Sequence, residues 1–494
     1  MNIYERHHHA ILQNIAHNVM LERGLHPDFS NEAISQLRKL NFPLKDIPDV
    51  RDMRNLLWAS IGNDDSLDVD QLIVAKTMPD GRIRIMVAIA DVDAFVGKGT
   101  ALDKNAWHNT TSVYTATKIF PMLPDHLSTN LTSLNLNKDR LALVIEMDLD
   151  ADGSLLNSTV YRAFVCSHAK LAYNNIAPWL EKGGKVPEAI SVVSGLAENL
   201  LLQDKAAQSL KKLRHIRGAL TLETVETKPI FDRDQIKELI TEDKNRAKEI
   251  IEDFMIVANG ITARFLSTHG FPSIRRVMRT PKRWDRIVEI AENHQYELPY
   301  EPDLKALEEF LVHAKAANHM RFSDLSLAVI KLLGSGEYVA ESSDETVPGH
   351  FGLDVKDYAH STAPNRRYSD LLTQRLLKAA LEGKPIPYAK EEMDELALHC
   401  TKSEDIAAKV ERRVEKSAAA LLLESRLGET FDAIVTGASE KGTWVRLFTI
   451  PIEGKVEQGY EDLDVGDQVR VQLILVDVQK GFIDFRHVNS QRRR

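Results

Sequence analysis

The chain has few cysteines and no long apolar run. Cys166 and Cys400 are its only cysteines, far apart and outside any ligand-like spacing, so neither a disulfide scaffold nor a zinc site is indicated. No stretch approaches the roughly 20 apolar residues that a membrane helix needs. The first residues also lack the basic-then-apolar pattern of a secretory signal. We therefore expect a cytoplasmic protein with no membrane partner.

The chain also lacks an excess of positive charge. Its formal net charge of -9 argues against indiscriminate binding of polyanions, although nucleic acid can bind where basic residues are concentrated. A hydrophobic content of 43% and a charged content of 27% are typical of soluble globular proteins. A length of 494 residues exceeds one ordinary core, so several domains are expected.

A cluster of acidic side chains occupies residues 63–71. Asp64, Asp65, Asp68 and Asp70 lie there, directly before an apolar run. Carboxylates repel one another unless a cation gathers them, and hard oxygen ligands suit Mg²⁺ or Mn²⁺. Asp68 and Asp70 are two residues apart, so both point to one face of an extended segment and can share a metal ion. The alternative interpretation is a solvated acidic turn.

Hydrophobic periodicity indicates the order of the elements. Residues 1–50 show helical spacing, and residues 72–76 and 82–90 read as a β-hairpin with a proline-glycine turn. This hairpin would place the acidic cluster at the mouth of a sheet. Further predicted elements are a strand at 141–149 and helices at 251–265 and about 404–426. Beyond residue 428, short strands separated by glycines favour a small barrel.

An ordered set of motifs follows the acidic cluster, at residues 89–92, 102–103, 112–114, 121–124, 130–134, 252–259 and 363–370. Together they resemble the ribonuclease II family of exoribonucleases, in the short bacterial form. The resemblance implies an α+β fold, in which helices surround a mixed sheet. It divides the chain into a helical N-terminal region at 1–50, a catalytic domain at 51–427 and a five-stranded OB-fold RNA-binding barrel with a basic tail at 428–494.

The resemblance implies hydrolytic, processive 3′→5′ degradation of single-stranded RNA to nucleoside 5′-monophosphates, by a monomer that uses Mg²⁺ or Mn²⁺. Carboxylate-held divalent ions suit this chemistry, because they activate water and neutralise phosphate charge. Asp68 and Asp70 match the second and third aspartates of the family's catalytic quartet, and Asp70 matches the catalytic motif best.

The other two positions of the quartet depart from the family. Its first aspartate aligns with Gly62, which has no ligand atom, and its fourth with Gln71, which offers a neutral amide oxygen. Asp64 and Asp65 are close enough in sequence to substitute as ligands. If they do not, metal affinity and turnover should both fall.

The resemblance also assigns RNA contacts. Arg366 matches the arginine that grips the scissile phosphate, since a guanidinium binds phosphate oxygens in bidentate fashion. Arg367 is a second candidate, with a surface arginine at a helix start as the alternative. Tyr114 matches the tyrosine that stacks on the terminal bases and sets the length of the final product.

Three further residues are weaker candidates for RNA binding. Tyr173 matches a second aromatic of the RNA channel, with a buried core tyrosine as the alternative. Glu411 resembles the glutamate that contacts the terminal nucleotide, with a solvated helix position as the alternative. Trp444 lies on the predicted central strand of the barrel.

Three functions remain open. The leading one is the metal-dependent exoribonuclease. Gly62 and Gln71 motivate a second, an RNA-binding protein that kept the RNA path and lost the metal site. A third, a phosphodiesterase for short oligoribonucleotides, follows because only about fifty helical residues precede the catalytic domain, too few for the two OB-fold modules usual in the family.

Overall fold

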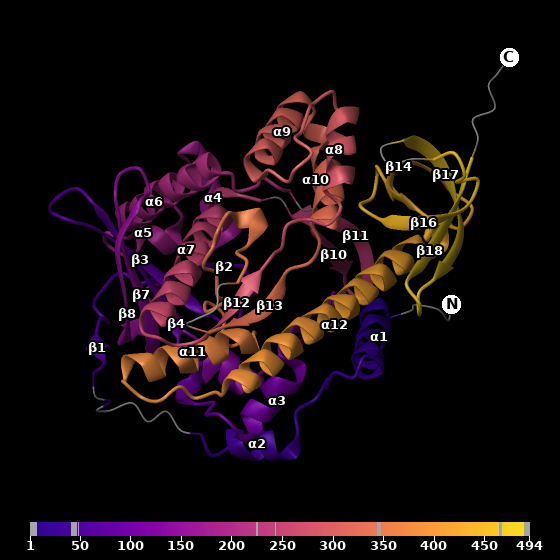
Figure 1. Cartoon of the computed structure of the whole chain (residues 1–494). Coiled ribbons are helices and arrows are strands. Elements are labelled where there is room, and N and C mark those ends of the chain that lie inside the picture. Colours follow the sequence, from indigo (N-terminus) through magenta and orange to yellow (C-terminus); the bar gives the residue numbers. More distant parts are fainter. Residues whose placement is uncertain are drawn as a thin grey trace.

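A seven-stranded mixed sheet is the largest sheet of the described residues, and Figure 1 shows its strands at the left, on the side away from the C-terminal strands. The computed structural model describes residues 7–40, 47, 49–223, 226–242, 244–342, 347–463 and 467–488. The strand order is β1-β8-β7-β4-β3-β2-β9, with β1–β8 and β2–β9 parallel and the other pairs antiparallel. The strands are β1 (Arg51–Asp52), β2 (Ala59–Gly62), β3 (Gln71–Thr77), β4 (Ile83–Ala90), β7 (Asp139–Leu149), β8 (Leu155–Cys166) and β9 (Ala169–Ala172).

Helices cover this sheet. Strands β4 and β7 are buried over almost their whole length and β3 over residues 72–75, as expected where side chains on both faces pack against other elements. Helix α6 (Leu196–Arg217) packs against β3 and β4, and α7 (Arg246–Thr268) contacts β2, β7 and β8. The structure thus confirms the predicted α+β class and the mixed sheet surrounded by helices.

The predicted hairpin is present as β3 and β4. Its register runs from Gln71 opposite Ile89 to Thr77 opposite Ile83. The turn closes through the Gly81 N–H, which donates to the Met78 carbonyl at 2.9 Å, and Gly81 has a positive φ of 87° that favours glycine. The hairpin therefore places the acidic cluster at the end of the sheet where β3 begins.

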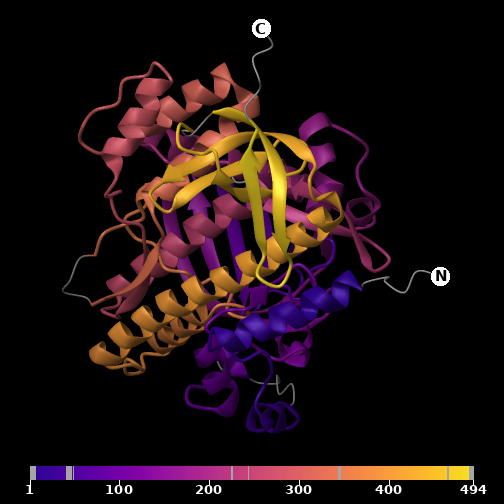
Figure 2. The ribbon, with the colours of Figure 1, turned by 90° about the vertical axis from the view of Figure 1, so that its right-hand side faces the viewer.

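A long helix, α12 (Lys390–Leu423), connects the sheet region to the C-terminal barrel, and Figure 2 shows it crossing the molecule below the barrel. It begins well before the predicted residue 404, because Met393, Leu396 and Cys400 continue the apolar stripe and are buried. The first helix, α1 (His8–Glu22), packs along α12 through a shared apolar cluster. The N-terminal region is therefore helical, as predicted, and is docked onto the remainder of the chain.

The C-terminal residues form a closed five-stranded barrel, which confirms that part of the predicted fold. Its strands are β14 (Thr430–Ser439), β15 (Gly442–Leu447), β16 (Glu453–Gln458), β17 (Gln468–Asp477) and β18 (Phe482–His487). The end of α12 contributes Ala420 and Leu423 to the barrel core. Arg446 Nη1 on β15 forms an ion pair with Asp324 Oδ1 on α10 (His319–Leu333) at 3.0 Å. The predicted basic tail at 492–494 lies outside the described residues.

Among the remaining elements, α2 falls within the helical region predicted at residues 1–50, and most of the others were not predicted from the sequence. Helices α8, α9 and α10 share a separate apolar cluster beside the barrel, and three short two-stranded sheets complete the fold. These elements are α2 (Asn31–Leu37), α3 (Ala101–Asn109), α4 (Tyr173–Lys182), α5 (Glu188–Ser191), α8 (Trp284–Asn293), α9 (Leu304–Ala317), α11 (Tyr368–Leu381), β5 (Val113–Tyr114), β6 (Ile119–Phe120), β10 (Glu226–Asp232), β11 (Gln235–Glu242), β12 (Ser273–Val277) and β13 (Glu337–Glu341), with short turns η1 (Val92–Ala94), η2 (His126–Leu131), η3 (Phe351–Leu353) and η4 (Glu424–Arg426). In the part of the chain that the structure describes, none of the helices combines the length and apolarity that crossing a membrane requires.

Candidate active site

Asp70 occupies a buried position immediately before β3. The Ala90 N–H donates to the Asp70 carbonyl at 2.9 Å, which extends the β3–β4 pairing by one residue. On the other side, the Val69 N–H donates to Ser133 Oγ at 2.9 Å. The Asp70 side chain is only 5% exposed. Backbone hydrogen bonds therefore hold this carboxylate in place inside the protein.

Burial makes the charged forms of both aspartates unfavourable. It raises the pKa of Asp70 from an ordinary 3.8 to about 6, an effect that Arg366 opposes and the neighbouring Asp68 charge increases. The pKa of Asp68 is also raised, mainly by burial, with Arg366 and Lys170 opposing the shift. Two partly desolvated carboxylates beside each other are typical of functional sites, because folding alone gains nothing from their repulsion.

The segment before α11 supplies the positive charge of the site. Arg366 Nε lies 3.5 Å from Asp70 Oδ2, and the Asn365 N–H donates to Asp70 Oδ1 at 3.3 Å. The segment is anchored by the Ser112 N–H, which donates to the Arg366 carbonyl at 3.0 Å. The Arg366 side chain is 43% exposed, so its guanidinium can reach both Asp70 and a ligand from solvent.

Tyr114 joins the same site from β5. Its backbone N–H donates to Glu411 Oε1 on α12 at 2.8 Å, while its ring is partly exposed. Burial of the hydroxyl raises the pKa of Tyr114 to about 12, and Arg366, Asp68 and Asp70 all lie close enough to influence it. Burial also raises the pKa of the Glu411 carboxyl. Glu411 therefore positions Tyr114, and its predicted contact with RNA stays a prediction.

Tyr173 approaches the site at the start of α4. Its pKa is raised by burial and lowered in part by Arg366. The preceding strand β9 pairs with β2 so that Ala172 lies opposite Gly62. Lys170 on β9 donates through Nζ to the Ser66 carbonyl. Strand β9 thus brings Tyr173 and Lys170 to the loop that carries the acidic cluster.

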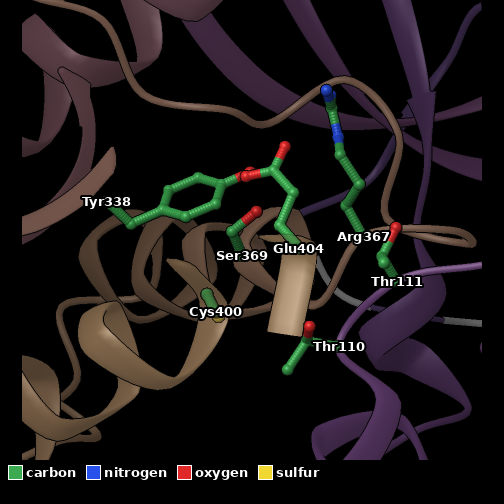
Figure 3. Close-up of a pocket in the computed structure, with 7 residues that line it drawn as sticks. All are labelled: Thr110, Thr111, Tyr338, Arg367, Ser369, Cys400 and Glu404. Carbon is green, nitrogen blue, oxygen red and sulfur yellow. The ribbon is translucent and has the colours of Figure 1, made fainter. Parts of the chain in front are cut away.

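Arg367 turns to the interior instead. Its Nη2 donates to Asp370 Oδ1 at 2.7 Å, and the side chain is 20% exposed. Figure 3 shows Arg367 among the residues that line a small cavity, together with Tyr338 and Glu404. The guanidinium therefore has a structural partner, and its predicted RNA contact stays a prediction. The surface position considered as the alternative is wrong, because this arginine is largely enclosed.

The remaining acidic residues of the cluster lie apart from Asp70. Asp64 and Asp65 are exposed on a turn, and Asp65 Oδ2 pairs with Lys228 Nζ at 3.2 Å. Within the described ranges, no three aspartate, glutamate, histidine or cysteine side chains are grouped so that they could hold a metal ion. The structure does not gather Asp64 or Asp65 with Asp68 and Asp70, and their predicted ligand role stays a prediction.

The positions that depart from the quartet lie at strand ends. Gly62 is the last residue of β2, and Gln71, the first residue of β3, is half-buried. Asp68 and Asp70 remain as two mutually repelling oxygen donors, a set whose chemistry fits a hard divalent cation. The site residues present here therefore fit Mg²⁺ or Mn²⁺, with fewer charged ligands than four aspartates would offer.

Trp444 belongs to a different part of the molecule. It lies half-buried on β15 of the barrel, where its carbonyl accepts a hydrogen bond from Thr436 Oγ1 at 3.4 Å. Its predicted role in RNA binding stays a prediction.

Four residues of the site were missed as functional candidates. Lys170 lowers the pKa of Asp68 and Asp125 raises it. Asn365 and Thr132 are hydrogen-bonded to each other beside Asp70. Asp125, Thr132 and Asn365 lie in or directly beside the motifs at 121–124, 130–134 and 363–370, and Lys170 lies three residues before Tyr173. Their polar side chains near these segments were the available signal, but only the folded chain shows which of them lie beside the carboxylates.

Comparison with known families identifies the class of this protein. The RNB domain matches residues 50–383, and the RNase II-type exonuclease C-terminal S1 domain matches residues 429–488. The chain therefore belongs to the RNB-domain family, as the resemblance to ribonuclease II predicted.

Its relatives are ribonucleases R. That of Aquifex aeolicus (strain VF5) is 30% identical over 512 residues, covering 95% of this chain and 70% of the relative. Ribonuclease R 1 of Lactococcus lactis is 27% identical over 96% of this chain, and the chain spans only 61% of that relative's length. The structure of Mycoplasma genitalium RNase R has a TM-score of 0.87 and 22% identity, covering 97% of this chain and 78% of that one, which shows the shared fold.

Proposed function

We propose that this protein is a divalent-metal-dependent exoribonuclease that degrades single-stranded RNA from the 3′ end and releases nucleoside 5′-monophosphates. The observation that carries the proposal is the pair of buried Asp70 and half-buried Asp68 beside the exposed guanidinium of Arg366. The names of the relatives support the reaction class, and the Mycoplasma genitalium protein was solved in complex with ribose methylated single-stranded RNA.

Each side chain has a role that its position supports. Arg366 binds the scissile phosphate, because its guanidinium is exposed while Asp70 holds its Nε. Tyr114 stacks on a terminal base without reading its identity, and Glu411 fixes the backbone of Tyr114. When bound by Asp68 and Asp70, Mg²⁺ or Mn²⁺ supplies Lewis-acid stabilisation of the phosphate and an activated water.

The test uses purified protein and 5′-labelled single-stranded RNA, with Mg²⁺, with Mn²⁺ and with a chelator. We expect a ladder that shortens to a small limit product only when the metal is present, with 5′-monophosphates released. Asp70→Asn should abolish hydrolysis while RNA binding is roughly preserved, since it removes a charged ligand and keeps the shape of the side chain. Full activity of Asp70→Asn would contradict the proposed role of the pair.

A second candidate function is RNA binding without hydrolysis. Gly62 favours it, because the first ligand position of the quartet has no side-chain atom and the described residues do not gather a third carboxylate. The same assay separates the two functions. RNA that stays intact with either metal, but is retained in a gel-shift assay, supports the binding protein.

A further inference from the structure

The side chain of Asn365 contains a buried polar group that lacks a partner. Asn365 is only 1% exposed, and its Oδ1 accepts a hydrogen bond from Thr132 Oγ1 at 2.6 Å. Among the described residues, its Nδ2 has no hydrogen-bond partner. The Asn365 side chain also lowers the pKa of Asp70 as a hydrogen-bond donor, so its amide faces this carboxylate, although Nδ2 and Asp70 do not meet at the distance and angle of a full hydrogen bond. An unsatisfied buried group of this kind costs about 1–3 kcal/mol and calls for a reason.

The partner of this amide, Thr132, can either donate or accept. Thr132 Oγ1 lies 2.9 Å from the Leu127 carbonyl and 2.6 Å from Asn365 Oδ1, and both oxygens can accept its hydroxyl hydrogen. A hydroxyl has one hydrogen, so it cannot donate to both at once. When the hydrogen goes to Leu127, Thr132 Oγ1 becomes an acceptor, and the Asn365 atom that faces it must be a donor.

A half-turn of the Asn365 amide satisfies this second arrangement. The two ends of a carboxamide are nearly equal in size, so the turn exchanges Nδ2 and Oδ1 without a change in packing. Nδ2 then donates to Thr132 Oγ1, and Oδ1 faces the Asp70 side of the site. Beside two carboxylates this oxygen would be repelled, so the present orientation suits the protein without metal. A divalent cation reverses the preference, because it attracts all three oxygens.

We propose that Asn365 supplies its amide oxygen as a further ligand to the cation held by Asp68 and Asp70, with Thr132 orienting the amide. The inference rests on the proposed metal-dependent function and deepens it. It gives the site a third oxygen donor, from a part of the chain remote in sequence from the acidic cluster, where Gly62 provides none. Neutral amide oxygens are ordinary ligands of hard divalent cations.

Binding of Mn²⁺ alone tests this without turnover. The free Mn²⁺ signal in electron paramagnetic resonance is titrated with wild-type protein, Asp70→Asn, Asn365→Leu and Asn365→Asp in the absence of RNA. Asn365→Leu has a similar shape and no ligand atom, and we expect its affinity to fall about tenfold or more. Asn365→Asp keeps an oxygen and adds charge, so it should bind at least as tightly as wild type.

A matched control separates loss of a ligand from general loosening of β3, the strand that follows Asp70. Asn199 on α6 has both ends of its amide paired with the Ala75 backbone of β3, at 3.0 Å and 2.7 Å. Asn199→Leu therefore removes an amide that holds the same strand without touching the carboxylates, and Mn²⁺ affinity should be unchanged. Thermal melting of each variant without metal shows whether it folds.

Two results would overturn the inference. If folded Asn365→Leu binds Mn²⁺ as tightly as wild type does, the amide is not a ligand of the cation. If the same variant then binds RNA more weakly, the amide is instead a hydrogen-bond donor to RNA. Weaker binding by Asn365→Asp than by wild type also contradicts the proposal, and this variant decides if Asn365→Leu does not fold. Failure of the proposed metal-dependent function would give a different result. Wild-type protein would then bind no Mn²⁺, or would bind it with the same affinity as Asp70→Asn.

Discussion

Asp70→Asn removes one buried negative charge and keeps the size of the side chain. The pKa of Asp70 is raised from 3.8 to about 6, chiefly by burial. Each pKa unit is worth about 1.4 kcal/mol, so the ionised carboxylate should destabilise the metal-free fold by about 3 kcal/mol at pH 7. We therefore expect metal-free Asp70→Asn to be more stable than wild type by up to about that amount, while hydrolysis is lost.

The sign of the pH dependence follows from the same shift. Because the folded-state pKa is the higher one, the native protein binds more protons than the unfolded chain between about pH 4 and pH 6. The destabilisation is fully present above about pH 6 and is relieved as the pH falls toward 4. This part of the pH dependence should disappear in Asp70→Asn.

Urea denaturation with a chelator measures the effect, and Asp253→Asn is a matched comparison. Burial also raises the pKa of Asp253 to about 6, but Asp253 forms a largely enclosed ion pair with Arg214. The pKa of Asp253 stays raised despite this partner, so the same reasoning expects metal-free Asp253→Asn to be more stable than wild type as well. Metal-free Asp70→Asn that is no more stable than wild type, or less so, would refute the reasoning for Asp70.

Added metal should reverse the order of the two proteins. A ligand that binds only the folded state adds about 4.1 kcal/mol of stability at a concentration 1,000 times its Kd, which exceeds the destabilisation of about 3 kcal/mol expected from ionised Asp70. Wild-type protein should therefore gain stability with Mn²⁺, and Asp70→Asn should gain little. Equal gains would place the cation elsewhere in the molecule.

Three other predictions concern single residues of the site and the barrel. Tyr114→Ala should weaken the hold on the last nucleotides by about 1–3 kcal/mol and lengthen the limit product on a sequencing gel, and an unchanged limit product would leave the ring without a role in stacking. Trp444→Ala should lower the affinity for long RNA, measured by gel shift, and leave cleavage of short oligonucleotides intact; equal affinity would leave Trp444 without an RNA role. Gly62→Asp should tighten Mg²⁺ binding and raise activity at low Mg²⁺, with Gly62→Asn as the uncharged control. No effect of Gly62→Asp would show that this strand end does not face the metal.

The structure answers one question about Gly62 that the sequence left open. A glycine at this position could reflect a backbone that requires positive φ, in which case aspartate would strain the turn. Gly62 is not among the positive-φ residues, and an added Cβ would meet only Ser66 at ordinary contact distance, 3.9 Å from Oγ. Backbone strain is therefore no obstacle to Gly62→Asp.

The amino-acid sequence by itself determined the features that depend on local pattern. Alternating and helical spacing of apolar residues predicted the β3–β4 hairpin, the strand β7 and the helix α7, because burial of one face is encoded within a few residues. The glycines beyond residue 428 predicted the barrel, because they separate short strands. Asp68 and Asp70 were found because they are neighbours in sequence and share one face.

Only the tertiary structure decided which distant residues meet these two aspartates. Asn365 and Arg366 reach Asp70 from the segment before α11, and Glu411 reaches Tyr114 from α12. The fold also leaves Asp64 and Asp65 exposed, while Asp70 is buried and Asp68 half-buried, although all four are close in sequence. Such contacts depend on how whole elements pack, because a side chain's local spacing carries no information about which remote segment will cover it.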